Sequence, residues 1–403
     1  MPKEYRKTAY ACYLADMIQA VVINLTPLLF VLLKDAYGLR YSQFGTLVFV
    51  NFATQVLVDI GCSKPVDRYG YRPFVVAAHF LCGGGLCFFA LTPWLLPGRE
   101  FAGFLIGTVI FAGAGGLFEL LLSPIVDALP SENKAREMSL LHSMYAVGKL
   151  GCIILTTLAL VLGLSWQSIV LTYAALPFLN ALFFFKVPLV RKCKREEVTS
   201  SGKMLMSPTF LLALAAILFS GGAECTMSQW SSTFMQEGLD LPKAWGDLLG
   251  VGGFALMLGL GRLVHGLYGY RFDLSRLLVL GSCLAVCSYL VAAVAPVPWM
   301  GAAACALTGF FVSISWPGTL SMASASLPKA GTALFALLAA GGDMGGSIGP
   351  WIVGKAADMQ ILHGVSSERS LKNAIFLAAL LPLTAAFFQW RLGKARQPSR
   401  EGT

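Results

Sequence analysis

Three ionisable residues lie inside two neighbouring apolar stretches of the sequence. Glu119 falls in residues 113–127, and His142 and Lys149 fall in residues 139–151. A charged side chain inside a bilayer costs at least about 2.5 kcal/mol unless it pairs or faces water. A carboxylate at such a depth can load and release a proton, and a lysine can neutralise it or bind an anionic substrate. These residue types therefore predict proton handling inside a membrane.

The predicted proton-coupling carboxylates are Glu119 and Asp16, the latter in the first apolar stretch. A carboxyl group that exchanges water for apolar surroundings binds a proton more readily, so a cavity that faces each side in turn can load and release it. The alternative is that Glu119 only pairs with Lys149 or His142 to hold the helices together. Lys149 is interpreted as the partner of Glu119, with direct binding of an anionic substrate as the alternative. His142 is counted with this group, although an interhelical hydrogen bond is its simplest role, ahead of a proton relay.

Other polar residues recur at helical spacing, so each set shares a helix face that must turn toward the bundle interior or a water-filled cavity. In the first half these sets are Asp16 and Gln19; Asn51, Gln55 and Asp59; Glu119, Ser123 and Asp127; and His142, Tyr145 and Lys149. The predicted substrate-binding residues of this half are Gln19, Asn51, Gln55 and Tyr145.

The second half adds five candidate substrate-binding residues: Glu224, Gln229, Trp230, Trp316 and Asp343. A tryptophan face suits the apolar face of a sugar ring, although a buried tryptophan is usually packing or an interface anchor. Asp343 is interpreted either as a substrate ligand or as a pairing residue. The glycines that recur every fourth residue from 341 to 349 indicate close helix contact or a hinge before they indicate a site.

Composition assigns these stretches to a membrane. The 403 residues are 56% hydrophobic and 13% charged, with a mean hydropathy of +0.70, whereas soluble domains carry about 25% charged residues. A membrane span needs about 20 apolar residues. The sequence then divides into twelve spans, at about 8–33, 41–60, 73–95, 101–128, 137–163, 167–187, 207–233, 243–265, 274–296, 298–321, 331–355 and 370–391.

Lysine and arginine gather in the loops and ends on one side of these spans. The positive-inside rule then predicts an inner (plasma) membrane protein with both termini in the cytoplasm. The first span lacks a cleavage site and is expected to stay in place. Residues 188–206 are basic and serine-rich, which predicts a cytoplasmic linker that contacts anionic lipid head groups rather than nucleic acid. The predicted six-helix bundles are 1–187 and 207–395, with a cytoplasmic tail at 396–403.

A short repeat supports two related halves. The tetrad YGYR at 69–72, after the second span, recurs at 268–271, after the eighth. Recurrence at the same loop of each half is what duplication of a six-helix unit requires.

The residues around the first tetrad, DRYGYR, resemble the loop signature of the major facilitator superfamily. Asp67, Arg68, Gly70 and Arg72 match that signature, whereas Ser63 stands where the family usually has glycine. The resemblance implies an all-α membrane protein with twelve transmembrane helices in two pseudo-symmetric six-helix bundles, the major facilitator fold. It also implies a cytoplasmic gate at Asp67, Arg68 and Arg72, the alternative being a solvated loop that only sets topology. The second copy lacks the acid–arginine pair, so the gate is expected in the first copy alone.

Short motifs also resemble the fucose permease-like branch of the superfamily, whose members move sugars with protons. The motifs are Glu119 with Ser123-Pro124, the run SLLHSMYAVGK from residue 139, and GGAECTMSQW at 221–230. The resemblance implies that Asp16 and Glu119 link proton coupling to sugar binding.

These observations predict a secondary active transporter that takes up a monosaccharide or sugar acid with protons by alternating access. The first alternative is a proton-coupled exporter of apolar or cationic compounds, although the fifth helix reads GKLGCIIL in place of the exporters' GPxxGG motif. The second alternative, a non-transporting receptor or a membrane enzyme, would need a soluble domain or a catalytic constellation. The sequence has no HExxH or GxxxxGK[ST], so no enzyme is expected.

The expected partners are a small-molecule substrate, protons and membrane lipids, with no nucleic acid. The chain is expected to act as a monomer without a cofactor or metal. Its ten cysteines are expected to be free thiols, since they lie in apolar runs or beside basic loops and form no CxxC.

Overall fold

A computed structural model describes residues 2–131, 134–190, 206–327 and 331–396. A few side chains within these ranges, those of Asp67 and Tyr270 among them, lie outside the description. All regular structure in the described ranges is helical, and eleven helical segments are long and apolar enough to cross a membrane. The glycine-rich helix Gly331–Leu362 is a twelfth long segment. The predicted all-α membrane fold is confirmed.

The first six helices follow the predicted spans, because a chain in a bilayer must satisfy its backbone polar groups within itself. They are α1 (Lys3–Tyr37), α2 (Tyr41–Tyr69), α3 (Tyr71–Leu95), α4 (Glu100–Ala128), α5 (Lys134–Val161) and α6 (Trp166–Lys186). Helix α1 ends at Gly38, whose φ of 63° suits glycine and whose N–H donates to the Lys34 carbonyl.

Helix α2 is longer than its sequence predicts. It continues through the predicted loop to Tyr69, and the chain turns only at Gly70, where φ is 84°. No glycine occurs between Gly61 and Gly70 to stop the helix earlier. Asp67 and Arg68 therefore stand on the last helical turn and not in a loop.

The later spans contain more interruptions. Their elements are α8 (Pro208–Thr233), η1 (Phe234–Gly238), α9 (Lys243–Trp245), η2 (Gly246–Gly252), α10 (Gly253–Tyr268), η3 (Gly269–Arg271), α11 (Leu274–Val294), α12 (Pro298–Val312), α13 (Ser315–Ser326), α14 (Gly331–Leu362), α15 (Ser367–Ala378) and α16 (Leu380–Arg396). The tenth span is split into α12 and α13, and the twelfth into α15 and α16. Elements η1 and η2 are π-helices, a rare form that often marks functional sites.

Contacts divide the chain into two compact units. The first comprises Met1–Leu39 and Val50–Lys194, and the second comprises Arg40–Phe49 and Arg195–Thr403. The first turns of α2 thus cluster with the second unit, which the sequence does not predict. Residues 191–205 of the predicted linker and 397–403 of the predicted tail lie outside the described residues.

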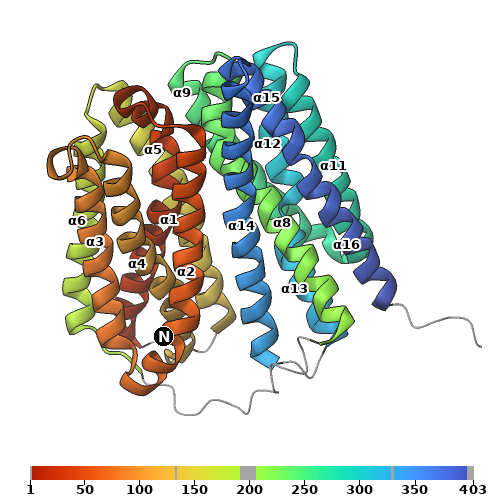
Figure 1. The fold of residues 1–403 in the computed structure, drawn as a ribbon. Coiled ribbons are helices and arrows are strands. Elements are labelled where there is room, and N and C mark those ends of the chain that lie inside the picture. Colours follow the sequence, from red (N-terminus) through yellow and green to blue (C-terminus); the bar gives the residue numbers. More distant parts are fainter. Residues whose placement is uncertain (1, 132–133, 191–205, 328–330, 397–403) are drawn as a thin grey trace, which may run out of the picture. The chain divides into compact units, whose positions relative to one another are not determined.

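In the first unit, α3 packs against α4 and α6, while α1 packs against α4, α5 and α6 (Figure 1). Glycines permit close approach between these helices. A Cβ atom added to Gly148 of α5 would lie 2.6 Å from the Cα atom of Met17 in α1. This contact brings the polar residues of α5 beside those of α1.

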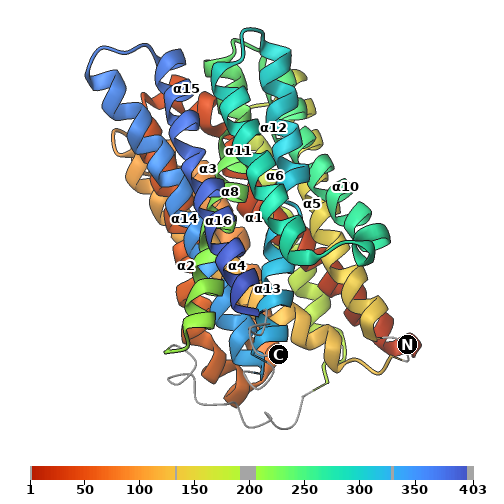
Figure 2. The ribbon, with the colours of Figure 1, turned by 90° about the vertical axis from the view of Figure 1, so that its right-hand side faces the viewer.

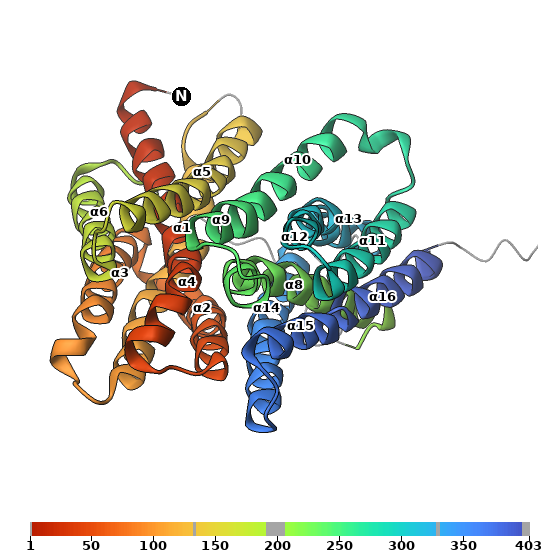
Figure 3. The same ribbon diagram turned by 90° about the horizontal axis from the view of Figure 1, so that it is seen from above.

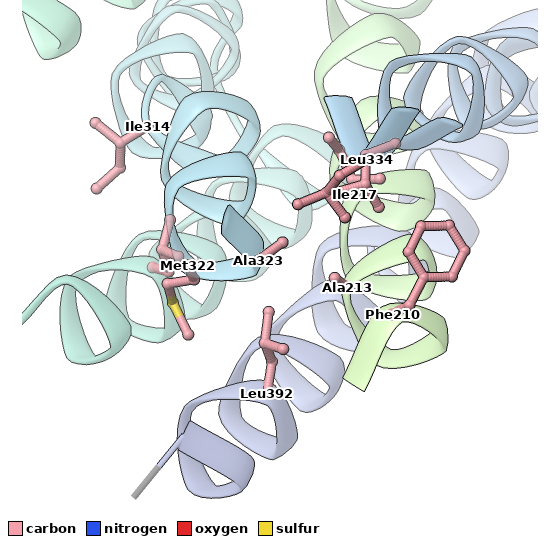
Figure 4. Packing of buried hydrophobic residues seen from close by; sticks show 10 residues of the cluster. Phe210, Ala213, Ile217, Ile314, Met322, Ala323, Leu334 and Leu392 are labelled. Carbon is pink, nitrogen blue, oxygen red and sulfur yellow. The ribbon is translucent and has the colours of Figure 1, made fainter. Parts of the chain in front are cut away.

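In the second unit, α8 is surrounded by α12, α13, α14 and α16 (Figure 3). Gly345 of α14 lies against the carbonyl group of Leu218 in α8, and Gly221 of α8 lies against Gly342 of α14. Near the start of α8, an apolar core joins this helix to its neighbours (Figure 4); it contains Phe210, Ala213, Ile217, Leu278, Ile314, Met322, Ala323, Leu334, Leu338 and Leu392.

Candidate functional site

Three carboxylates meet in the first unit. Gly116 of α4 packs against Gln55 of α2, since an added Cβ atom would lie 2.6 Å from the Gln55 carbonyl oxygen. One turn further along each helix, Asp59 and Glu119 lie within electrostatic range of each other, and Asp16 of α1 lies within range of Glu119 as well. The structure thus brings together the two predicted proton-coupling carboxylates and adds a third.

Asp16 is the most enclosed of the three carboxylates. It is 7% exposed, and its Oδ2 atom is buried without a hydrogen-bond partner among the described residues. Its carboxyl group approaches the backbone of Tyr145 in α5. Lys149, also buried, lies one turn further along α5. A buried oxygen without a donor costs about 1–3 kcal/mol, which a proton or a ligand donor would offset.

The other two members of the predicted proton-coupling group are accessible to solvent. The side chains of Glu119 in α4 and His142 in α5 are both exposed. Within the first unit, the group therefore combines a buried acid and a buried lysine with an accessible acid and an accessible histidine. Glu119 or His142 can therefore exchange protons with water while Asp16 and Lys149 stay enclosed.

Amide side chains lie on the same helices, α1 and α2, as Asp16 and Asp59. The Asn51 amide donates to the Val22 carbonyl at 3.0 Å, and the Gln55 amide donates to the Asn51 side-chain oxygen at 2.6 Å. The Asn24 amide donates to the Tyr145 hydroxyl at 3.4 Å. Gln19 is buried on the same helix as Asp16. These residues join α1, α2 and α5, and substrate binding by Gln19, Asn51, Gln55 and Tyr145 stays a prediction.

In the second unit, Glu224 of α8 faces Arg262 of α10. The Arg262 Nη2 atom lies 3.6 Å from the Glu224 Oε1 atom, and the Arg262 Nε–H donates to the Ser313 carbonyl at 3.3 Å. The Glu224 side chain is 18% exposed and that of Arg262 is 50% exposed. The pair is accessible enough to exchange its ionic partner for a ligand.

Trp230 is enclosed in the second unit. Its side chain is fully buried, and its indole N–H donates to the Pro350 carbonyl at 2.9 Å. The Tyr41 ring meets it edge-on, with the ring centroids 6.0 Å apart. In this arrangement the indole packs against protein on all sides, so contact with a sugar would require the unit to open here.

Trp316 and Asp343 lie closer to accessible space. The partly buried Trp316 ring covers the backbone of Gly342 in α14, and the half-buried Asp343 follows directly. Gln229 is buried next to Trp230 in α8. The structure therefore places Trp316 against Gly342, the residue before Asp343, whereas it places Gln229 and Trp230 in the interior.

The predicted gate residues are distributed over two helices. Arg72 of α3 donates to the carbonyls of Phe184, Phe185 and Val187 at the end of α6, at 2.8, 2.6 and 2.8 Å. The exposed Arg68 guanidinium lies 5.2 Å from the centroid of the Tyr69 ring. The Asp67 side chain lies outside the described part of the structure. These contacts of Arg72 all lie within the first unit, and the gate stays a prediction.

Two residues at these sites are absent from the predicted set. Asp59 belongs to the same helix face as Asn51 and Gln55, so its spacing already indicated that it turns toward the polar interior. Arg262 stands near the inner end of the predicted span 243–265. Only the packing of α10 on α12 and α8 shows that Glu224 is its partner. The described residues include no group of three histidine, cysteine, aspartate or glutamate side chains placed to hold a metal ion.

A protein-family model matches most of the chain. The family model of the Major Facilitator Superfamily matches residues 12–350. None of the curated proteins matches the sequence.

Solved structures resemble the whole chain. A bacterial homologue of the human lysosomal transporter Spinster is 15% identical, with 98% of each chain covered and a TM-score of 0.78. A D-xylose-proton symporter is 12% identical, with 100% of each chain covered and a TM-score of 0.77. A variant of the E. coli fucose:proton symporter FucP is 17% identical, with 98% of this chain and 100% of that chain covered and a TM-score of 0.62. At these identities the likeness describes the fold.

Proposed function

The chain belongs to the Major Facilitator Superfamily, and on this premise we propose that it is a proton-coupled uptake carrier for a monosaccharide or sugar acid. Two of the similar structures are named as sugar-proton symporters. The observation that carries the proposal is the cluster of Asp16, Asp59 and Glu119 inside the helices of the first unit.

Repulsion within the cluster supplies the coupling. Like charges within electrostatic range of one another repel, and a bound proton relieves this repulsion. A carrier that has bound the proton carries less charge at its centre and can change conformation at lower cost. The accessible Glu119 takes the proton from water. The charge of the enclosed Asp16 interacts with Glu119, so a substrate that binds at Asp16 changes how tightly Glu119 holds the proton. Lys149 offsets part of the remaining negative charge.

Each unit offers polar groups for substrate recognition. In the first unit, Gln19 and the amides of Asn51 and Gln55 offer hydrogen bonds to hydroxyl groups. In the second unit, Glu224, Arg262 and Asp343 offer charged partners, and the partly buried Trp316 offers an apolar face for a sugar ring. A sugar acid would exchange its carboxylate for that of Glu224 at the Arg262 guanidinium.

Export of a cationic compound is the second candidate function. The same three carboxylates can receive a positively charged group in place of a proton, and this observation favours a cation as cargo. Both functions share the expected placement, a monomer in the plasma membrane with cytoplasmic termini and no cofactor.

Transport into proteoliposomes tests the proposal. Labelled L-fucose, D-xylose, D-galactose and D-glucuronate are offered with an inward proton gradient, with and without a protonophore. Gradient-driven accumulation of one of them, abolished by the protonophore, is expected. Glu119→Gln is expected to lose accumulation but keep exchange of labelled for unlabelled sugar. The control is Glu368→Gln, since Glu368 is an exposed residue paired with Lys372 in α15.

Two results would overturn the proposal. One is the absence of accumulation for every sugar and sugar acid. The other is accumulation by Glu119→Gln that depends on the proton gradient as in the unmodified protein. Efflux of an organic cation driven by the same gradient, with no sugar accumulation, would favour the second candidate.

A further inference from the structure

An apolar groove lies in the second unit, away from the polar residues described above. It is formed by the end of α10, by η3, by the first half of α11 and by the end of α12, and its volume is about 180 Å3. In Figure 2, α10 runs down to the turn at η3, and the chain returns through α11. Helix α12 contacts both α10 and α11. The groove thus has two walls and a floor.

Two glycines create the floor. A Cβ atom on Gly261 of α10 would lie 2.8 Å from the Phe310 carbonyl oxygen, and one on Gly281 of α11 would lie 2.6 Å from the Phe311 carbonyl oxygen. The missing side chains let α12 approach both helices closely while leaving open space beside them. Larger residues at these positions would separate the helices or fill the groove.

The groove is open at the surface of the helices. Its lining residues Val264, Phe272 and Leu280 are 42%, 61% and 55% exposed. These residues belong to or flank helices that are apolar enough to cross a membrane, and we expect them to face lipid there. A flexible hydrocarbon chain fits such a groove, because it can fill an irregular apolar surface without an unsatisfied polar group.

Positive charge gathers at one end of this groove. The Arg271 guanidinium lies 5.6 Å from the centroid of the ring of Tyr268, a lining residue. Arg276 is exposed in the first turn of α11, and His265 lines the groove. The nearby acid Asp273 accepts a hydrogen bond from the Arg276 backbone N–H at 2.9 Å. The end of the groove therefore carries two arginines against one acid that caps a helix.

We propose that this groove binds one anionic phospholipid. An acyl chain occupies the apolar part, and the phosphate lies at Arg271 and Arg276, where cationic side chains and the N-terminal end of α11 attract negative charge. The excess of lysine and arginine assigns this end to the cytoplasmic leaflet. The second copy of the repeated tetrad lacks the acid–arginine pair of the first, and its residues Tyr268 and Arg271 gain a role at the rim of this site.

Native mass spectrometry of the purified full chain tests the site. The protein is stripped of lipid in detergent and titrated with dioleoylphosphatidylglycerol or dioleoylphosphatidylcholine. One phosphatidylglycerol is expected to bind more tightly than phosphatidylcholine. Arg271→Gln is expected to weaken phosphatidylglycerol binding about fivefold, and Val264→Trp is expected to reduce binding of both lipids by filling the groove.

Matched controls separate the groove from general adhesion of lipid. Arg391→Gln removes an exposed arginine of α16, and Leu263→Trp enlarges an exposed neighbour of Val264 outside the lining. Both are expected to bind as the unmodified protein does. Equal affinity for the two lipids, or an Arg271→Gln affinity equal to that of Arg391→Gln, would overturn the proposal. Arg271 is exposed, so this comparison stands even if Val264→Trp does not fold.

Discussion

The carboxylate of Asp358 caps the helix that begins at Tyr41. Its two oxygens accept hydrogen bonds from the backbone N–H groups of Tyr41 at 3.1 Å and Ser42 at 2.7 Å, the first residues of α2. Gly354, one turn earlier in α14, lies against the Tyr41 carbonyl. Helix N-termini attract negative charge because their first N–H groups lack partners within the helix. The start of α2 is thus fixed on α14 by a charged cap and by close backbone contact.

Removal of this cap is expected to destabilise the second unit. Asp358→Ala leaves two N–H groups without their acceptor and should cost about 1–2 kcal/mol, and Asp358→Asn should cost less because its amide oxygen still accepts. Thermal unfolding in detergent, followed by intrinsic fluorescence, measures the melting temperatures. We expect the highest value for the unmodified protein, a lower one for Asp358→Asn and the lowest for Asp358→Ala. An Ala variant that melts with the unmodified protein would show that the cap contributes nothing.

Arg72 is expected to act first as a cap for α6. Arg72→Ala removes three hydrogen bonds from a guanidinium to backbone carbonyls, and we expect a loss of about 2 kcal/mol, since such bonds are partly exposed and act together. The exposed Arg99, which precedes α4, supplies the control, and Arg99→Gln should leave the melting temperature unchanged. A slower transport rate in Arg72→Ala at an unchanged melting temperature would instead indicate the gate that the sequence signature implies.

Two glycine-to-alanine substitutions are expected to act in opposite directions. A Cβ atom on Gly345 would collide with the Leu218 carbonyl, and backbone cannot move aside without separating α14 from α8. Gly345→Ala should therefore destabilise by about 2 kcal/mol or more. Gly151 has open space around its Cα atom in α5, so Gly151→Ala should be neutral or stabilising by up to about 1 kcal/mol. Equal melting temperatures for the two variants would contradict the close contact.

Trp230 is expected to matter for stability more than for affinity. Trp230→Phe removes the indole hydrogen bond to the Pro350 carbonyl and leaves unfilled space in the interior, which should cost about 1–3 kcal/mol. The KM for the proposed sugar substrate should stay unchanged, because the indole is covered by protein. Trp316→Phe is the comparison, since that ring is only partly buried. A raised KM with an unchanged melting temperature in Trp230→Phe would support the sugar stacking that its residue type suggests.

The sequence predicts the parts of this fold that depend on local pattern. Twelve apolar stretches follow from hydropathy alone, and the stripe of Asn51, Gln55 and Asp59 follows from helical spacing. Which helices become neighbours depends on glycine contacts such as Gly148 with Met17, and no local pattern encodes the partner of a glycine. For that reason the sequence predicts Trp230 as a substrate-binding residue, although Pro350 and Tyr41 cover its indole in the fold.

Local pattern also misplaces an element end. The residues DRY of the loop signature are polar, so hydropathy ends the second span at about residue 60, but polarity alone does not stop a helix. The chain stays helical until Gly70 offers a positive φ. The acid cluster shows the same limit, since Asp16, Asp59 and Glu119 lie on three different helices and only packing brings them together.

Asp59 and Glu119 are expected to act as one unit in proton coupling. Because the two carboxylates lie within electrostatic range, the loss of one changes how the other binds a proton, and their effects should not add. A double-mutant cycle of Asp59→Asn, Glu119→Gln and the pair measures exchange of labelled for unlabelled sugar, which Glu119→Gln is expected to keep, at several external pH values. We expect a coupling of about 0.5–3 kcal/mol, with each single variant shifting the pH profile of the remaining carboxylate. The control cycle pairs Glu119→Gln with Glu368→Gln, whose effects should add. Additive effects of Asp59 and Glu119 at every pH would mean that Asp59 is a bystander, and coupling would then rest on Asp16 and Glu119 alone.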